Sequence, residues 1–491
     1  MPIQRWSCSQ LLRATSTLLL VSGCAMSQQS TWKTDGVSER IVGSALMRGG
    51  AMTFLETLTD TIGGRVTGSP ESQEASELIL KTLKDAGFDN AHFEEYPLAV
   101  RWRRGPAIGS VVSPVKQPIL IQSYGWAPGT NGRKQLMLLP AEIAADGKVS
   151  GDKAKLRGSA VLVDLASGTD ISTSANYVVR RATIARELAK VGAAAMLIQS
   201  DKPGRMLYTS AAGLYPLAPL PILSTAKEDA LFLRRLLLKG EVRLELDVQN
   251  SFDTSAKERN VIADLPGSSP EEIVLLGAHF DSWDTAPGAN DDGSGIAAIL
   301  ESARILKSLG IKAKATIRFA FFSGEEQACL GSRAYIQAHN DALDHYWAAL
   351  TMDSGAQMPL GFALAGRKDL EEPTKRLLGS LSSLGADGLT SGDLSNDNES
   401  FVVAGIPTLD LWVSAGDYDI NHHAVTDTLD KIDSRALAVD TAVLAVASYF
   451  IANADQRLGR RLTSKEVHDL LESTGELEYV ELDYRNQDTN H

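Results

Sequence analysis

A mixed α/β fold with a mainly parallel sheet, flanked by helices and interrupted by a β-rich module, is predicted by three patterns along the chain. Helical periodicity dominates residues 38–87, short β-type runs with Pro- and Gly-rich turns fill residues 114–250, and strands alternate with helices after residue 260. Such alternation is typical of parallel sheets joined by crossover helices. The 491 residues, 44% of them hydrophobic, exceed what one core usually spans, so we expect more than one domain.

The first part of the main domain, residues 37–113, should begin with two amphipathic helices. The second of these is opened by Ser69, with Pro70 at the first helical position, and is closed by Gly87. Serine is a favoured N-cap, proline is tolerated in the first turn, and glycine commonly follows the last turn.

Residues 114–250 are expected to form the inserted β-rich module. Aliphatic residues dominate its short runs, and breaker residues separate them. The expected elements are the strands Gln135–Leu139, Ser159–Leu165, Ala194–Ile198 and Val242–Val248, with one strong helix at Ala182–Val191.

The second part of the main domain, residues 251–455, repeats a strand, a loop and a helix. A C-terminal extension follows at residues 456–491, with a capping-box pattern at Thr463 and Glu466. The expected pairs in the main domain are the strand Ile273–Leu276 with the helix Ser294–Leu309, and the strand Ala315–Phe322 with the helix Glu325–His339.

The N-terminus has the pattern of an export signal at residues 1–23. Two arginines and the apolar run Leu18–Val21 precede two small residues and Cys24. This resembles a bacterial lipobox, in which cleavage precedes the cysteine and the cysteine is acylated. Ala25 then favours a lipid anchor on the periplasmic face of the outer membrane, followed by a polar tether at 24–36. The alternative is an ordinary signal peptide with a chance cysteine, and no other stretch is expected to span a membrane.

The charge balance does not suggest a polynucleotide partner. Lys and Arg number 48 against 61 Asp and Glu, which gives a net charge of -13. Such a chain as a whole repels nucleic acid and anionic surfaces.

Five short segments carry the ionisable residues that predict a reaction. Alone, each has an ordinary explanation as a strand-end turn, a helix cap or favourable pairing with a helix dipole. Together they supply two imidazoles and three carboxylates for a pair of zinc ions, and one spare glutamate to move protons. This combination predicts a hydrolytic centre. The segments are His279-Phe-Asp281, Asn290-Asp-Asp292, Glu325-Glu326, Met352-Asp353-Ser-Gly355, and His422-His423 with Asp427.

In this order the motifs resemble those of the co-catalytic zinc aminopeptidase and glutamate carboxypeptidase family. The segment from Gly277 to Asp284 and the double histidine are most similar to its bacterial members of the plasma glutamate carboxypeptidase type. The similarity runs from about Ser38 to Asp455. It implies a zinc exopeptidase fold for the main domain, a peptidase domain, and a protease-associated domain for the inserted module.

The resemblance also implies the ligand set for two Zn²⁺ per chain. Asp291 would bridge the two ions, His279 and Asp353 would complete one site, and Glu326 and His423 would complete the other. All five positions are intact in this chain.

We expect three further residues to take part in the predicted reaction. Glu325 would act as general base toward a metal-bridged hydroxide and then as general acid toward the leaving amine. The Asp281 carboxylate could accept the second ring N–H of the histidine before it and fix that ring's tautomer. His422 would donate a hydrogen bond to the developing oxyanion, or would only orient its loop.

The charge of one segment suggests which terminus of a peptide substrate is bound. Between Arg376 and Lys431 there is no lysine or arginine, whereas aspartates and glutamates crowd the same stretch. Such a segment suits a free α-amine and lacks a guanidinium for a carboxylate, which favours an aminopeptidase or dipeptidase acting on short peptides.

Three alternatives stay open beside this interpretation. The same scaffold could carry a carboxypeptidase or a glutaminyl-cyclase-like activity, or the chain could be a non-catalytic, lipid-anchored binding protein. The intact Glu325 argues against the last of these, because a closed structural zinc site has no use for a spare base. A homodimer is left open.

Overall fold

The computed structural model describes residues 36–144, 147–150, 152–165, 171–392, 394 and 396–488. The predicted export signal, Cys24 and the predicted tether up to residue 35 lie outside the described residues.

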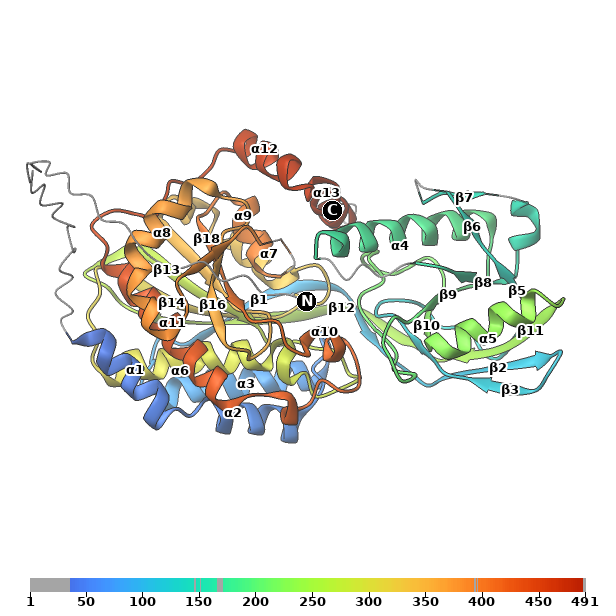
Figure 1. The fold of residues 1–491 in the computed structure, drawn as a ribbon, viewed down its shortest axis with the longest axis horizontal. Helices are drawn as coiled ribbons and strands as arrows, with labels where there is room; N and C mark the ends of the chain where they lie inside the picture. Colours follow the sequence, from blue (N-terminus) through green and yellow to red (C-terminus); the bar gives the residue numbers. More distant parts are fainter. Residues whose placement is uncertain are drawn as a thin grey trace, which may run out of the picture. The chain divides into compact units, whose positions relative to one another are not determined.

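The main sheet has eight strands in the order β1-β12-β14-β13-β15-β18-β16-β17. Figure 1 labels several of these strands and the helices that accompany them. The sheet's central strands, β14, β13, β15 and β18, are parallel to one another, and antiparallel pairs flank them on both sides. The prediction of a mixed α/β fold is therefore confirmed. The strands are β1 (His92–Arg103), β12 (Ser251–Leu265), β13 (Ser269–His279), β14 (Ala315–Phe322), β15 (Tyr346–Thr351), β16 (Pro359–Ala363), β17 (Gly388–Thr390) and β18 (Thr408–Val413).

Alternate residues of the central strands enter two different cores. Val274 and Leu276 of β13 pack with the first group of helices, whereas Ile273 and Leu275 pack with the second. This follows from the two-residue period of a strand that is buried on both faces. The first group is α1 (Val37–Arg48), α2 (Ala51–Thr57), α3 (Pro70–Asp85), α6 (Ser294–Ser308), α8 (Glu371–Leu378) and α11 (Ser434–Asn453), and the second is α7 (Leu330–Ala338) and α9 (Asn398–Val403).

Helix α11 corrects the expectation that no stretch beyond the leader could span a membrane. The helix has 20 residues, and an 18-residue stretch of it has a mean hydropathy of 1.6, so it is long and apolar enough to cross a membrane. However, 83% of that stretch is buried inside the protein. It is the central helix of the larger core, where a helix apolar on all sides belongs.

Helix boundaries agree with the sequence where caps define them and differ at the predicted site. The Ser69 hydroxyl accepts a hydrogen bond from the Ser72 N–H at 3.0 Å, as an N-cap does. The helix expected from Glu325 instead begins at Leu330, because residues 325–329 form a turn in which Ala328 and Cys329 have positive φ. The glutamate pair therefore lies on a turn and not on a helix.

The second sheet also has eight strands, in the order β3-β2-β11-β5-β8-β9-β10-β4. It begins at residue 107, seven residues before the predicted boundary at 114, because β2 pairs with β11 of this sheet. The module also contains two helices where the sequence predicted one, and its strands β5, β8, β9 and β10 are parallel. Its elements are β2 (Ala107–Ser113), β3 (Gln117–Ile119), β4 (Ile121–Ser123), β5 (Lys134–Pro140), β8 (Ala160–Val163), α4 (Ile171–Val191), β9 (Ala195–Gln199), β10 (Ile222–Thr225), α5 (Lys227–Leu237) and β11 (Val242–Val248), beside the small pair β6 (Glu142–Ile143) and β7 (Val149–Ser150).

The C-terminal extension forms two helices, α12 (Ser464–Thr474) and α13 (Leu477–Asp488). The capping box is present, with Thr463 and Glu466 each accepting from the other's backbone N–H. Helix α13 packs against α4 of the second sheet, and its Asp483 pairs with Arg333 of α7 at 3.4 Å.

Asp440 in the middle of α11 generates a prediction about stability and pH. Its side chain is fully buried, neither carboxyl oxygen has a hydrogen-bond partner among the described residues, and burial, with a smaller contribution from Asp433, raises its pKa well above the ordinary value. The folded state then holds this proton over a pH range in which the unfolded state has lost it, so stability falls as pH rises above the unfolded-state pKa.

We therefore expect Asp440→Asn to stabilise the protein more at pH 8 than at pH 5. The difference in the free energy of unfolding should be about 1–3 kcal/mol, measured by urea titration at both pH values. Asp387→Asn, at an exposed position, is the control. An equal effect of Asp440→Asn at the two pH values would contradict this origin of the penalty.

Candidate metal centre

Three neighbouring parallel strands deliver predicted site residues to one edge of the main sheet. His279 ends β13, the Glu325-Glu326 turn follows β14, and Asp353 follows β15. The carboxyl ends of parallel strands meet at the same edge, where open α/β sheets place their ligands. The His279 side chain is only 1% exposed, so its ring nitrogen must find a partner inside the site.

Asp291 reaches the same place from the turn before α6. Gly288 has φ +64°, and a Cβ there would lie 2.5 Å from the Ser282 Cβ, so the sharp bend of this loop requires glycine. The Asp427 carboxylate accepts hydrogen bonds from the backbone N–H of Asn290 at 2.7 Å and of Asp291 at 3.2 Å. Asp427 therefore holds the turn that carries Asp291.

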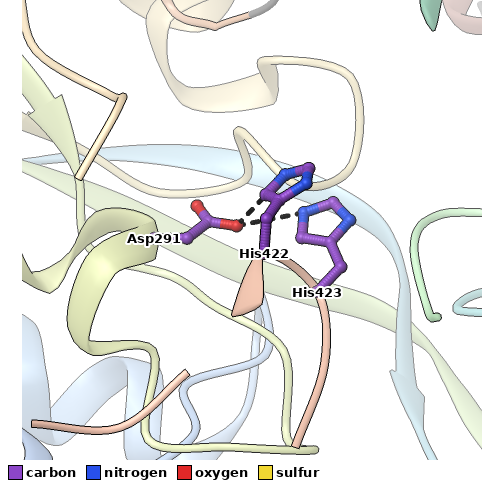
Figure 2. A group of neighbouring side chains, drawn as sticks. All are labelled: Asp291, His422 and His423. Carbon is purple, nitrogen blue, oxygen red and sulfur yellow. Dashed lines mark ion pairs between the residues drawn. The ribbon is translucent and has the colours of Figure 1, made fainter. Parts of the chain in front are cut away.

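The Asp291 carboxylate lies between two sets of donors. Its Oδ1 is 3.3 Å from His279 Nε2. Its Oδ2 is 3.1 Å from His423 Nε2, a contact that Figure 2 shows beside His422. His279 Nε2 also lies 3.6 Å from Asp353 Oδ2, and His423 Nε2 lies 3.0 Å from Glu326 Oε2. All five predicted ligands are thus brought together, with one oxygen of Asp291 facing each group.

Several buried atoms of this group have no hydrogen-bond partner among the described residues. They include His279 Nε2, Glu326 Oε1 and Asp353 Oδ1. Buried polar atoms normally have a partner, and imidazole with carboxylate is a donor set that suits zinc. Potential ligand atoms within 4.8 Å of one another occur in two sets, Asp291 with His422 and His423, and His279 with Asp292 and Asp353. The residues therefore fit divalent cations, with Asp292 and His422 close beside the predicted ligands.

The electrostatics of the site also favour cations. Burial, with a smaller contribution from Asp291, outweighs the nearby histidines and raises the pKa of Glu326 to about 7 and of Asp353 to about 6. Burial alone would lower the pKa of His279, but Asp353 and Glu325 outweigh it and raise that pKa well above the ordinary value. The site carries more negative charge than the protein's own cations balance. A bound divalent cation would neutralise this excess and favour the ionised form of the carboxylates.

Asp281 contacts His279 differently from the expectation. His279 Nδ1 lies 3.0 Å from the backbone carbonyl oxygen of Asp281, while the Asp281 carboxylate is 3.5 Å away. That carboxylate instead accepts from the Thr67 hydroxyl at 2.7 Å and from the Glu325 backbone N–H at 3.3 Å. The carbonyl therefore orients the imidazole, and the carboxylate orients the glutamate turn.

Glu325 lies beside the ligands without joining the closest contacts. Its Oε2 is 3.8 Å from His279 Nε2, and burial raises the pKa of its carboxyl well above the ordinary value. A carboxyl group with a raised pKa next to a cation site can accept a proton and release it again.

His422 lies against both its neighbour and a tyrosine. Its ring centroid is 3.7 Å from that of His423 and 5.1 Å from that of Tyr418 in α10 (Tyr418–Asn421), and its Nε2 is 3.6 Å from Asp291 Oδ2. Burial, followed by the charge of His423, lowers the pKa of His422 well below the ordinary value. A neutral imidazole in this place can donate one hydrogen bond toward the site.

Sequence reasoning missed the residues that brace this arrangement. Arg65 is fully buried and donates to the carbonyl oxygens of Phe280 at 2.7 Å and Gly288 at 3.0 Å, which ties the end of β13 to the Asp291 turn. From the second sheet, Thr209 N–H donates to the His423 carbonyl at 3.0 Å. No motif surrounds either residue, so local sequence offered no signal for them.

Comparisons with known proteins find similar peptidases. Residues 260–448 match the model of peptidase family M28. Carboxypeptidase Q of Mus musculus is 29% identical over 416 residues, covering 83% of this chain and 86% of that protein. The probable lipoprotein aminopeptidase LpqL of Mycobacterium tuberculosis is 29% identical over 423 residues, covering 78% and 80%.

Solved structures share the fold. A peptidase M28 precursor from Shewanella amazonensis has a TM-score of 0.76 at 26% identity, covering 87% of this chain and 98% of that one. BSAP, a zinc aminopeptidase from Bacillus subtilis, has a TM-score of 0.65 at 20% identity, covering 84% and 97%. The chain therefore resembles peptidase family M28 over residues 260–448, and these similarities, together with a donor set that suits zinc, support a zinc metalloexopeptidase.

Proposed function

We propose that this protein is a dinuclear zinc aminopeptidase or dipeptidase that hydrolyses the N-terminal peptide bond of short peptides. The observation that carries the proposal is the Asp291 carboxylate, whose two oxygens face different histidines. A single carboxylate in that position suits a bridge between two cations. His279 and Asp353 would hold one ion with it, and Glu326 and His423 would hold the other.

The protein's own groups would then divide the work of hydrolysis. Bound zinc ions supply Lewis acidity, which polarises the scissile carbonyl and lowers the pKa of water. Glu325 accepts a proton from the attacking water at its carboxylate and delivers it to the leaving amine nitrogen. The Asp281 carboxylate keeps the Glu325 turn in place through the backbone N–H. His422 donates to the developing oxyanion.

The acidic surroundings of the site favour a free α-amine on the substrate. Asp292 and Asp397 are buried near the predicted ligands, and burial raises the pKa of Asp397 to about 7. A protonated amine would be stabilised among these groups. A carboxypeptidase is the second candidate, because carboxypeptidase Q is among the similar proteins.

Two features outside the metal centre complete the proposal. The second sheet, expected as residues 114–250 and starting at 107, would be a protease-associated domain inserted between the peptidase segments 37–113 and 251–455. Cys24 would carry the lipid that anchors the protein at the periplasmic face of the outer membrane, which the similarity to a probable lipoprotein aminopeptidase supports.

The site generates a prediction that separates holding metal from moving protons. Protein purified without chelator should contain two zinc ions per chain by elemental analysis. Glu325→Gln should keep both ions and lose about two to four orders of magnitude in kcat, whereas Asp291→Ala should lose metal and activity together. At most one zinc in the wild type, with no gain in activity from added zinc, cobalt or manganese, would refute the dinuclear centre. Near-normal kcat in Glu325→Gln would refute the role of Glu325 as general base.

For His422, we expect His422→Ala to keep both zinc ions and to lose roughly two to three orders of magnitude in kcat with little change in KM. Steady-state kinetics and elemental analysis on the same preparation check this. Loss of zinc would make His422 a ligand, and a change confined to KM would place it in the specificity pocket.

The anchor is tested by location. Cys24→Ser should move the protein from the membrane fraction to the soluble fraction, or block its maturation, when cells of a bacterial host are fractionated. Sedimentation of this variant with membranes at the normal mature size would rule out lipidation of Cys24.

A further inference from the structure

A loop of the second sheet forms a wall beside the metal centre. This loop follows β9, and the Ser200 hydroxyl braces it by accepting from the backbone N–H groups of Lys202 at 3.2 Å and Tyr208 at 3.1 Å. The Tyr208 ring centroid lies 5.5 Å from that of His423. Together with the bond from Thr209 to the His423 carbonyl, these contacts set the loop against the histidine pair.

Lys202 places a buried positive charge in this wall. Its side chain is 5% exposed, its Nζ donates to the carbonyl oxygen of Asp419, and its Nζ lies 5.6 Å from the Tyr208 ring centroid. Within the described part of the chain, no carboxylate oxygen forms an ion pair with this Nζ. The Asp201 and Asp419 carboxylates act on this ammonium group only from beyond ion-pair distance. An ammonium group offers three N–H donors, so its burial with one hydrogen-bond acceptor is costly.

Other cations near this wall have carboxylate partners. Arg104, which also donates to the Thr209 hydroxyl, pairs with Asp284 at 2.8 Å, and Arg205 on the same loop pairs with Asp229 at 2.7 Å. Lys202 therefore differs from its neighbours. It would gain most from an anion that arrives with the substrate.

We propose that Lys202 binds the free α-carboxylate of the substrate residue on the leaving side of the scissile bond. This inference rests on the proposed function and narrows its substrate class to dipeptides and other short peptides with a free carboxylate close to that bond. In a dipeptide the carboxylate is only a few bonds from the scissile carbonyl, so its binding group must lie next to the metal ligands. Lys202 is near the ligands by way of Tyr208, whose ring centroid lies 5.6 Å from Lys202 Nζ and 5.5 Å from the ring centroid of His423.

The test compares a dipeptide with its C-terminal amide, which differs only in the carboxylate. Wild-type enzyme should prefer the free acid by about 10- to 100-fold in kcat/KM, mainly through KM. Lys202→Gln can still donate to the Asp419 carbonyl, and Lys202→Met cannot. Both should abolish the preference, whereas Lys202→Arg should keep part of it, and Lys239→Gln, at an exposed lysine after α5, should leave it intact.

A binding measurement separates recognition from folding. In the Glu325→Gln background, calorimetry should show tighter binding of the dipeptide than of the amide, and Lys202→Gln should remove that difference. A preference that survives in Lys202→Gln, or a wild type without preference, would overturn the role of Lys202 while the proposed function stands. If the wild type hydrolyses neither compound nor any other peptide with a free amine, the proposed function fails and this inference fails with it.

Discussion

The buried negative charge around Asp291 is the constraint on which the rest of the structure depends. Carboxylates packed this closely repel one another, and they can stay buried only with cations among them. The same carboxylates raise the pKa of His423 against the effect of burial, so protons and divalent cations compete for its ring nitrogen. Cation binding should therefore weaken as pH falls, and the fold must hold the ligands in place by contacts that do not depend on the ions.

Groups outside the predicted ligand set make those contacts. Asp427 holds the Asp291 turn from one side through two backbone N–H groups, and Arg65 holds it from the other through carbonyl oxygens. Burial lowers the pKa of Arg65 to about 10, while the nearby aspartates oppose that shift. An arginine suits this place because its planar group can donate to several carbonyls at once and stays charged near neutral pH.

How much could be predicted from the sequence depends on whether local residues decide a feature. The strand-end ligands, the α3 cap and α6 follow from short patterns, and the structure brings the five predicted ligands together. The predicted start of α7 was wrong, because long-range contacts of Glu325 with Asp281 and of Cys329 with Asn396 accompany a turn at residues 325–329 in place of a helix. The edge of the second sheet was misplaced at 114, since only long-range pairing assigns β2 to that sheet. Lys202, Thr209 and Arg65 act across large sequence separations and leave no local pattern.

The connection between the two sheets explains why residues of the second one can shape the site. Arg103, at the end of β1, pairs with Ser251 at the start of β12, so the chain leaves and re-enters the main sheet at one point. Such a narrow connection alone would not fix a wall at the metal centre. The ion pair of Arg104 with Asp284 and the bond of Thr209 with His423 supply the missing constraints. Because the predicted ligands all come from the main domain, substitutions in the loop after β9 can alter substrate choice without removing a ligand.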